Sequence, residues 1–337
     1  MTKNKFGKAF VFSTMAISAW LLVACSSETA DKPIVIKFPH VTAPGTPKGQ
    51  GADRLRELVA ERLGDKVVVE VYPSSQLMND DDSLEALAFG EIQMIAISLS
   101  KFDRLTRKFM VFDLPFLFRD IAEVEGFQHS QAGQDLLNVI TDKGFKGLAY
   151  WHNGMKQFGG PQPITHPENG DGLKFRIMES DVLEAQILAM GGNPQKMAFG
   201  EVYQALQTGA IDAQENTWSN NYSQKFFEVQ DYFTESNHGY LGYLLAVNPS
   251  FWGGLPADIR SELESIVREV TTEVNANASA LNQRDKQRIL EAGTSEIVQL
   301  ADEDLAAWRT VMRPVWEEFA PEIGETIMAA TPAADTE

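Results

Sequence analysis

The sequence predicts a two-lobed α/β fold. Buried-strand patterns alternate with helical patterns, and one helix–Gly–strand unit occurs twice, because residues 86–93 and 205–212 share the frame Ala-Leu-x-x-Gly-x-Ile. The 337 residues also suit two domains better than one. Two such units indicate two similar lobes facing one cleft, although helix-to-strand connections through glycine are common and the match alone is weak.

An export signal is predicted at residues 1–25. Three lysines in the first eight residues precede an uncharged, largely apolar run at 9–24, the pattern of a basic n-region and an h-region, and the run is short for a membrane span. It ends in Leu-Val-Ala-Cys, which resembles a lipobox, so we expect lipidation of Cys25. The alternative is an ordinary signal-peptidase site, with Cys25 nearby and unmodified. Because Cys25 is the only cysteine, no intrachain disulfide can form.

The chain is acidic, with 29 basic and 47 acidic side chains. Loss of the signal would remove three lysines and no acid, which leaves 26 basic side chains against 47 acidic ones and a net charge of −21. Nucleic acids and anionic membranes bind basic patches, so neither is an expected partner of a chain this acidic. A lipid anchor at Cys25 is the only expected membrane contact. An anionic ligand would need a local basic pocket that overrides this global field.

After a polar tether at residues 26–33, the first part of the chain has the pattern of a doubly wound α/β half-unit. Its predicted elements are a strand at 34–38, a Gly/Pro-rich loop at 41–51, a helix over 55–63, a strand at 67–72, the helix–Gly–strand unit at 84–97, an apolar wall of the core at 111–118 and a helix ending near 143.

The second part is organised around residues 172–218. In the strand predicted at 173–177, Lys174 and Arg176 alternate with apolar residues, so both are expected to face water or a ligand. A helix then ends at Gly209, which suits a left-handed position after a helix. The predicted elements of this part are a strand at 147–151 running into 152–156, a loop at 161–172, a helix over 200–206, a strand over 211–216, a strand at 240–247 that returns to the first lobe, a long helix from 255 to about 290, a helix over 301–319 and a polar tail after 329.

Several segments, in the same order, resemble the solute-binding proteins of tripartite ATP-independent periplasmic (TRAP) transporters, and most closely the four-carbon dicarboxylate-binding, DctP-type branch. The segments are HVTAPGTPKGQG, VEVYPSSQL, LPFLF, GLAYWHNGMK, GLKFRI, MAFGEVYQALQTGAIDAQEN and NHGYLGY, within a resemblance from Ile34 to about Phe319. The resemblance implies a periplasmic-binding-protein-like fold with a hinge and a long helix spanning both lobes. The expected domains are lobe 1 at 34–152 with a return segment at 242–281, lobe 2 at 153–241 with 282–329, and a disordered tail at 330–337.

Arg176 and Asn216 are the leading candidates for ligand binding, because each lies towards the carboxyl end of a predicted strand, where open α/β sheets bind ligands. A guanidinium can bond both oxygens of a carboxylate, which an ammonium cannot do. In the family, an arginine of the G-L-K-x-R motif holds the ligand carboxylate, the asparagine of Q-E-N donates to it, and Lys156 stands where a second cation is found. Without these motifs, the three would be interpreted as a surface arginine, a turn asparagine and an unpaired loop lysine.

The distal end of the ligand is expected to contact the first lobe. Ser98 and Lys101 follow the strand of the first repeat, and His40 and Lys48 lie on the first loop. A second carboxylate requires a cation, so Lys48 and Lys101 are preferred, whereas His40 suits a structural hydrogen-bonded role equally well. Phe199 is predicted to pack either against the carbon chain of the ligand or within the core.

The expected function is capture of a small organic acid, such as succinate, malate or fumarate, by lobe closure and its delivery to TRAP membrane subunits. A monocarboxylate ligand and a ligand-sensing role for a membrane receptor stay open as alternatives, since His152, Met155 and Thr217 depart from the pattern of the branch. An enzyme is not expected, because the five histidines show no metal-ligand spacing and no G-x-S-x-G motif occurs. We therefore expect no metal, no cofactor and a monomer, and we interpret acidic pairs such as Asp80-Asp81 as solvated surface.

Overall fold

The computed structural model describes residues 32–332. The predicted export signal, Cys25 and most of the tether lie outside the described residues, as do residues 333–337. At the C-terminal limit of the described chain, Thr331 is buried and its hydroxyl donates a hydrogen bond to the carbonyl of Met328 over 2.7 Å.

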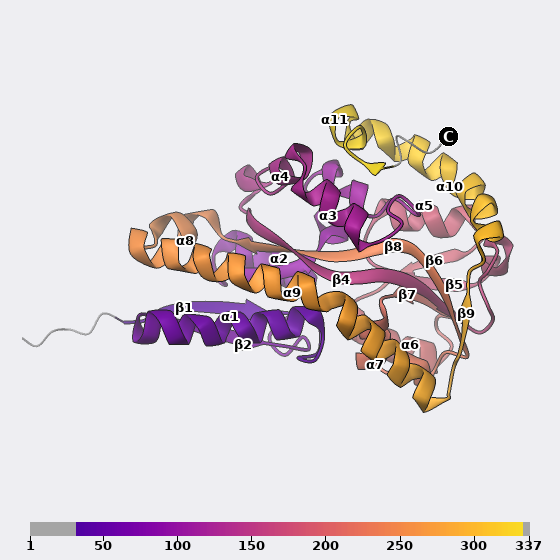
Figure 1. Ribbon diagram of the computed structural model, residues 1–337, viewed down its shortest axis with the longest axis horizontal. Helices are drawn as coiled ribbons and strands as arrows, with labels where there is room; N and C mark the ends of the chain where they lie inside the picture. The colour runs from indigo at the N-terminus through magenta and orange to yellow at the C-terminus, as the bar shows by residue number, and fades with distance from the viewer. Residues whose placement is uncertain (1–31, 333–337) are drawn as a thin grey trace, which may run out of the picture. The chain divides into compact units, whose positions relative to one another are not determined.

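Two sheets organise the described chain (Figure 1). A parallel pair is formed by β1 (Ile34–Pro39) and β2 (Val67–Tyr72). The larger sheet has the order β3-β8-β4-β7-β5-β6, with β9 paired to β8. Its strands are β3 (Met94–Ser98), β4 (Lys146–Gly160), β5 (Lys174–Ile177), β6 (Asn193–Lys196), β7 (Ala213–Asn216), β8 (Tyr232–Val247) and β9 (Glu296–Gln299).

The helices alternate with these strands, as the sequence predicts for an α/β chain. They are α1 (Pro47–Leu63), α2 (Asp80–Phe89), α3 (Ile121–His129), α4 (Gln131–Leu136), α5 (Asp181–Ala189), α6 (Val202–Gln207), α7 (Trp218–Ser223), α8 (Pro249–Gly254), α9 (Ala257–Ala292), α10 (Asp302–Ile323) and α11 (Glu325–Met328). The repeated unit is confirmed, because Gly90 after α2 and Gly209 after α6 both take positive φ angles, of 78° and 70°.

The long antiparallel pair β4 and β8 joins the two lobes. At one end of the pair, residues 146–152 of β4 lie beside residues 242–247 of β8, and β8 pairs there with β3. At the other end, residues 157–159 of β4 pair with β7, and residues 232–235 of β8 pair with β9. The prediction that this strand ends at Trp151 is therefore wrong. Strand pairing with β8 continues to Gly160 because three register shifts, the first between Gly147 and Ala149, absorb the irregular sequence.

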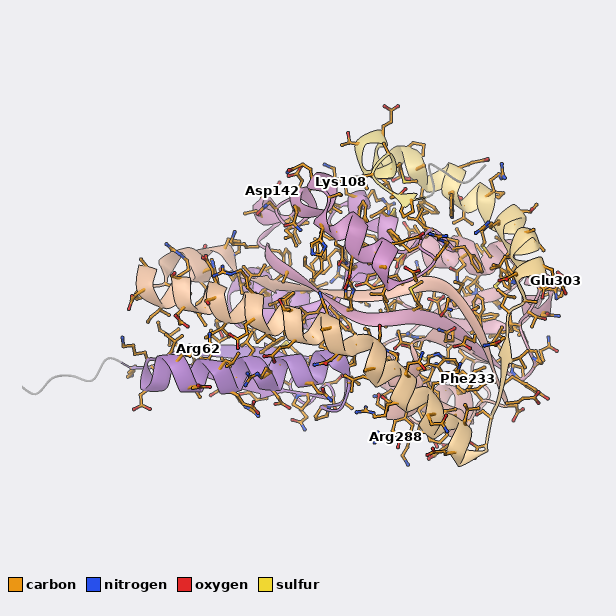
Figure 2. All side chains as sticks on the ribbon, in the orientation of Figure 1. Arg62, Lys108, Asp142, Phe233, Arg288 and Glu303 are labelled. Atoms are coloured by element: carbon orange, nitrogen blue, oxygen red, sulfur yellow. The ribbon has the colours of Figure 1, made fainter. Side chains whose placement is uncertain are left out.

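The long helix predicted from 255 to about 290 is confirmed as α9. It has 36 residues, so it is about 54 Å long at about 1.5 Å per residue. It packs against α1 and β4 in one half and against α7 in the other (Figure 1). On the α1 side, Arg62, which is labelled in Figure 2, forms ion pairs with Glu262, at 3.6 Å, and with Glu269 of α9.

Strand β3 separates two hydrophobic cores. Ile95 and Ile97 face a core that includes the 111–118 segment, α3 and α10, while Met94 and Ala96 face a core formed with β1, α1 and α9. The predicted apolar wall at 111–118 is thus confirmed. A third, smaller core lies among α6, α7, β8 and the end of α9, and it includes Phe233, labelled in Figure 2.

Other element boundaries also differ from the prediction, among them the start of β8, which lies at Tyr232 and not at residue 240. Helix α1 begins at Pro47, inside the expected loop, because the Thr46 hydroxyl accepts a hydrogen bond from the Gly49 amide and proline suits the first helical position. The helix expected to end near 143 is divided at Ser130, whose hydroxyl caps α4 by accepting from the Gly133 amide. Lys48 therefore lies in the first turn of a helix and not on a loop.

Candidate functional site

The candidate site is a cavity of about 50 Å³. Seven of the eight predicted binding residues line it, namely Lys48, Ser98, Lys101, Lys156, Arg176, Phe199 and Asn216. They come from α1, β3 and the turn after it, β4, β5, β7 and the turn before α6, so both halves of the fold contribute. His40 is not among the lining residues. Its buried ring shares a hydrogen bond of 3.2 Å with the Thr42 hydroxyl, and burial lowers its pKa to about 3, which agrees with the structural alternative.

Arg176 is a buried cation without an ion-pair partner among the described residues. Its Nε and Nη2 donate to the carbonyl of Met197 over 3.0 and 2.9 Å, which fixes the orientation of the guanidinium. Burial lowers its pKa to about 10, so the group stays charged at neutral pH. The guanidinium lies 5.9 Å from the centre of the Phe199 ring. A buried charge is costly unless it is paired, so this site is built to receive an anion. Lys174, on the same strand, instead donates to the carbonyl of Gly209.

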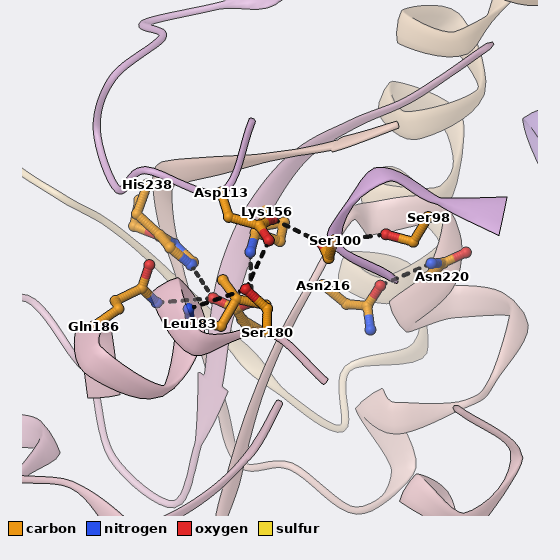
Figure 3. A network of polar contacts seen from close by, with 12 residues as sticks. Ser98, Ser100, Asp113, Lys156, Ser180, Leu183, Gln186, Asn216, Asn220 and His238 are labelled. Atoms are coloured by element: carbon orange, nitrogen blue, oxygen red, sulfur yellow. Dashed lines mark hydrogen bonds and ion pairs between the residues drawn. The ribbon is translucent and has the colours of Figure 1, made fainter. Parts of the chain in front are cut away.

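Lys156 is already compensated. It lies on β4, and its ammonium forms a buried ion pair with Glu215 of β7. The second oxygen of Glu215 accepts from Gln186 over 2.9 Å and lies 2.8 Å from Nε2 of His238 (Figure 3). Burial opposes ionisation, but the charge of Lys156 and the bond from His238 hold the pKa of Glu215 below its usual value. Lys156 is thus neither on a loop nor unpaired.

Asn216 belongs to a chain of amide hydrogen bonds. Its Oδ1 accepts from Nδ2 of Asn220 over 2.7 Å (Figure 3). The Oδ1 of Asn220 in turn accepts from Asn153, which also donates to the hydroxyl of Tyr243 over 2.6 Å. Since its carbonyl oxygen is engaged, Asn216 has its NH₂ group left to donate to an anion in the cavity.

The two preferred distal lysines differ in their surroundings. Lys48 is buried, donates to the carbonyl of Ala96 over 3.0 Å and lies 3.9 Å from the centre of the Tyr243 ring. Burial lowers its pKa to about 8, and no carboxylate of the described residues is paired with it. Lys101, in contrast, forms ion pairs with Asp81 at 2.8 Å and with Glu179 at 3.7 Å.

Ser98 connects the cavity to a buried polar cluster. Its hydroxyl donates to Ser100 over 3.3 Å, and Ser100 donates to Asp113 over 2.6 Å. The other oxygen of Asp113 accepts from Ser180 over 2.8 Å (Figure 3). Burial raises the pKa of Asp113 to about 6. The Ser98 hydroxyl is therefore already hydrogen-bonded to Ser100, and this bond holds Ser98 in the cavity wall.

Three carboxylates of the site, Asp80, Asp81 and Glu215, were not predicted from the sequence. Asp80 lines the cavity and Asp81 pairs with Lys101, so the interpretation of this pair as solvated surface is wrong. Asn79 caps α2 by accepting from the Asp82 amide, and an Asn followed by acids looks like helix capping in the sequence. Glu215 lies inside the Q-E-N motif. A charged residue within a strand predicted to be buried was the sequence feature that could have indicated its ion pair.

Between residues 32 and 332, no three His, Cys, Asp or Glu side chains come together as metal ligands. No helix in the same range is both long and apolar enough to cross a membrane.

Comparison with known proteins identifies the family. The model of the family "Bacterial extracellular solute-binding protein, family 7" (DctP) matches residues 38–322. The chain is 48% identical to the C4-dicarboxylate-binding periplasmic protein DctP of Vibrio cholerae over 303 residues, which cover 90% of this chain and 91% of that protein.

Two solved structures share the fold. A TRAP periplasmic solute-binding protein of Shewanella oneidensis with bound succinate superposes with a TM-score of 0.88 at 48% identity, covering 90% of this chain and all of the other. One from Pseudomonas aeruginosa with bound L-malate gives 0.83 at 47% identity, covering 85% of this chain and all of the other. These similarities confirm the two-lobed fold and the resemblance found in the sequence, and the family consists of binding proteins, not enzymes. The chain belongs to the bacterial extracellular solute-binding protein family 7, the DctP family.

Proposed function

We propose that this chain captures a four-carbon dicarboxylate on the outer side of the cytoplasmic membrane and delivers it to the membrane subunits of a TRAP transporter. The observation that carries the proposal is a pair of buried cations, Arg176 and Lys48, that line one cavity without carboxylate partners among the described residues. They come from β5 and α1, in different lobes. Two such cations match the two carboxylates of the ligand.

The ligands of similar proteins and the size of the cavity support this choice. The similar proteins of Shewanella oneidensis and Pseudomonas aeruginosa hold succinate and L-malate. One water needs at least about 10–15 Å³ of comparable cavity volume, so about 50 Å³ suits a compact acid better than a sugar acid. In this binding mode, Arg176 and Asn216 hold one carboxylate, Lys48 meets the other, and Phe199 covers the carbon chain.

Ligand capture would be coupled to lobe closure. The proposed lobes are 34–152 with 242–281 and 153–241 with 282–329. Polar contacts that connect these ranges include the bond from Ser180 to Asp113 over 2.8 Å, the ion pair of Arg107 with Asp181 at 2.7 Å, and the ion pair of Lys101, in the cavity wall, with Glu179 at 3.7 Å. Closure around a ligand is the usual motion of two-lobed binding proteins. It would remove water from Arg176 and the bound carboxylate, which strengthens their interaction.

The proposed location is the periplasm, with a monomer anchored to the membrane by a lipid on Cys25. The mass of the purified N-terminal peptide tests the anchor, because lipidation makes Cys25 the first residue and adds acyl chains to it. An unmodified N-terminus at another residue would contradict it.

The proposed ligand class is tested by calorimetry and thermal shift with succinate, fumarate, malate, monocarboxylates and sialic acid. A ligand at 100 times its Kd adds about 2.7 kcal/mol of stability, which is readily measured. Arg176→Lys should weaken dicarboxylate binding about 100-fold or more, because a point charge replaces a two-pronged donor in a desolvated pair. Lys174→Ala, on the same strand but bonded to Gly209, is the matched control and should bind normally. Binding of monocarboxylates alone, or near-native affinity of Arg176→Lys, would refute the proposal.

A further inference from the structure

Seven charged side chains line the cavity, and four of them form two ion pairs. Lys156 is paired with Glu215, and Lys101 is paired with Asp81. The remaining three are Lys48, Arg176 and Asp80. A dicarboxylate dianion would neutralise the two cations, so the occupied cavity would hold one uncompensated negative charge, that of Asp80.

Asp80 has the surroundings of a group that changes its protonation. It is the first residue of α2, it is only partly exposed, and within residues 32–332 its carboxylate has no hydrogen-bond or ion-pair partner. The charged groups that act on it are Lys48 of α1, Lys101 of the turn after β3, Arg176 of β5 and Asp81 of its own helix. Burial raises its pKa, while the three cations oppose that effect.

A bound dianion removes this opposition. Its two carboxylates neutralise the fields of Lys48 and Arg176, and this change favours the neutral acid. Closure of the lobes also excludes water, which makes an unpaired buried carboxylate more costly still. The neutral acid has a hydroxyl that can donate a hydrogen bond to the ligand, whereas the ionised form can only accept.

We propose that Asp80 takes up one proton from solvent when a dicarboxylate dianion enters the cavity, so that binding of this ligand class is proton-coupled. The inference rests on the proposed function. In this step an O–H bond forms on the Asp80 carboxylate while an O–H bond of a solvent hydronium ion breaks and releases water. Affinity then falls as pH rises above the pKa of Asp80 in the free protein, by about tenfold per pH unit while one full proton is taken up.

Other groups could also take up protons, and their contribution can be separated. Lys48, with a pKa of about 8, gains protons on anion binding mainly at alkaline pH. His40 and His238 are buried, and burial lowers the pKa of each below its usual value, which disfavours their charged forms. Measurements between about pH 6.5 and 7.5 keep the proton uptake by Lys48 small. The proton uptake that remains in an Asp80 variant is the contribution of the other groups.

The test is calorimetry of succinate binding to the purified protein in buffers of different ionisation enthalpy, which counts the protons exchanged. The wild-type protein should take up nearly one proton and bind more weakly at pH 7.5 than at pH 6.5. Asp80→Asn should take up almost none, and its Kd should not change with pH. Asp82→Asn is the matched control, because Asp82 is exposed on the same helix and does not line the cavity, and it should behave as the wild type.

Two results would overturn the inference while leaving the proposed function intact. They are succinate binding without proton uptake in the wild type, and undiminished uptake in Asp80→Asn. Absence of succinate binding at every pH would instead refute the proposed function, and this inference with it. A loss of folding in Asp80→Asn is detected by its circular dichroism, and the pH dependence of the wild-type Kd then decides alone.

Discussion

Replacement of Glu215 by glutamine should destabilise the protein strongly, although the two side chains have nearly the same shape. The Glu215 and Lys156 side chains are only 2% and 1% exposed, so the substitution leaves the Lys156 ammonium buried without its counter-charge. It also replaces an acceptor of bonds from Gln186 and His238 by a group that itself donates. Loss of one partner of a buried ion pair costs about 3–5 kcal/mol. At about 2–4 °C per kcal/mol, the Tm should fall by roughly 6–20 °C.

The assay is thermal unfolding without ligand at pH 7 and at acidic pH. The control is Glu228→Gln, which removes the exposed ion pair with Lys225 at 3.1 Å and should cost no more than about 1 kcal/mol. Because the pKa of Glu215 is held low in the folded protein, its contribution is present above the unfolded pKa of about 4 and is lost as pH falls further. The difference between wild type and Glu215→Gln should therefore shrink in acid. Equal Tm losses for the two variants at pH 7 would refute this reasoning.

Two further predictions concern Lys48 and Asp113. In calorimetry, Lys48→Met should weaken dicarboxylate binding about 100-fold or more but monocarboxylate binding much less. Lys101→Ala should weaken the binding of both ligand classes by less than about tenfold, because Asp81 already compensates the charge of Lys101. Equal losses for both ligand classes in Lys48→Met would remove Lys48 from the distal site. Asp113 has a pKa raised to about 6, so its favourable contribution is complete below the unfolded pKa of about 4 and is lost as pH rises through 6. Asp113→Asn should therefore gain up to about 3 kcal/mol relative to wild type between pH 4 and 7 in urea unfolding, and a difference independent of pH would contradict this.

The features that local sequence determines were predicted well. The periodic apolar residues of α9 and the two glycines, Gly90 and Gly209, are local signals, and the structure has the long helix and both left-handed turns. The course of β4 to Gly160 was not predictable in the same way, because its second half is a strand only through pairing with β7 and β8, far away in the sequence.

The candidate site shows the same division. Motifs identified Arg176 and Asn216, the need for a cation at the second carboxylate led to Lys48, and all three line the cavity. The motifs gave no information on which cations are compensated, because the partners Asp81 and Glu215 meet their lysines only in the folded chain. A lysine in a motif therefore indicates a position in the site, while its free charge depends on neighbours that the linear sequence does not reveal.

The valence of the ligand is set by what remains after these pairs are formed. The chain carries a large negative charge, but at physiological salt distant charges are screened beyond about 8 Å, so the groups lining the cavity dominate the field inside it. With Asp80 ionised, the three unpaired groups sum to a single positive charge, and with Asp80 protonated they sum to two. The same side chains thus match a monoanion or a dianion according to one proton. In the proposed binding mode, Glu215 and Asp81 lower the charge of a cavity lined by four cations, and the protonation of Asp80 adjusts that charge to the ligand.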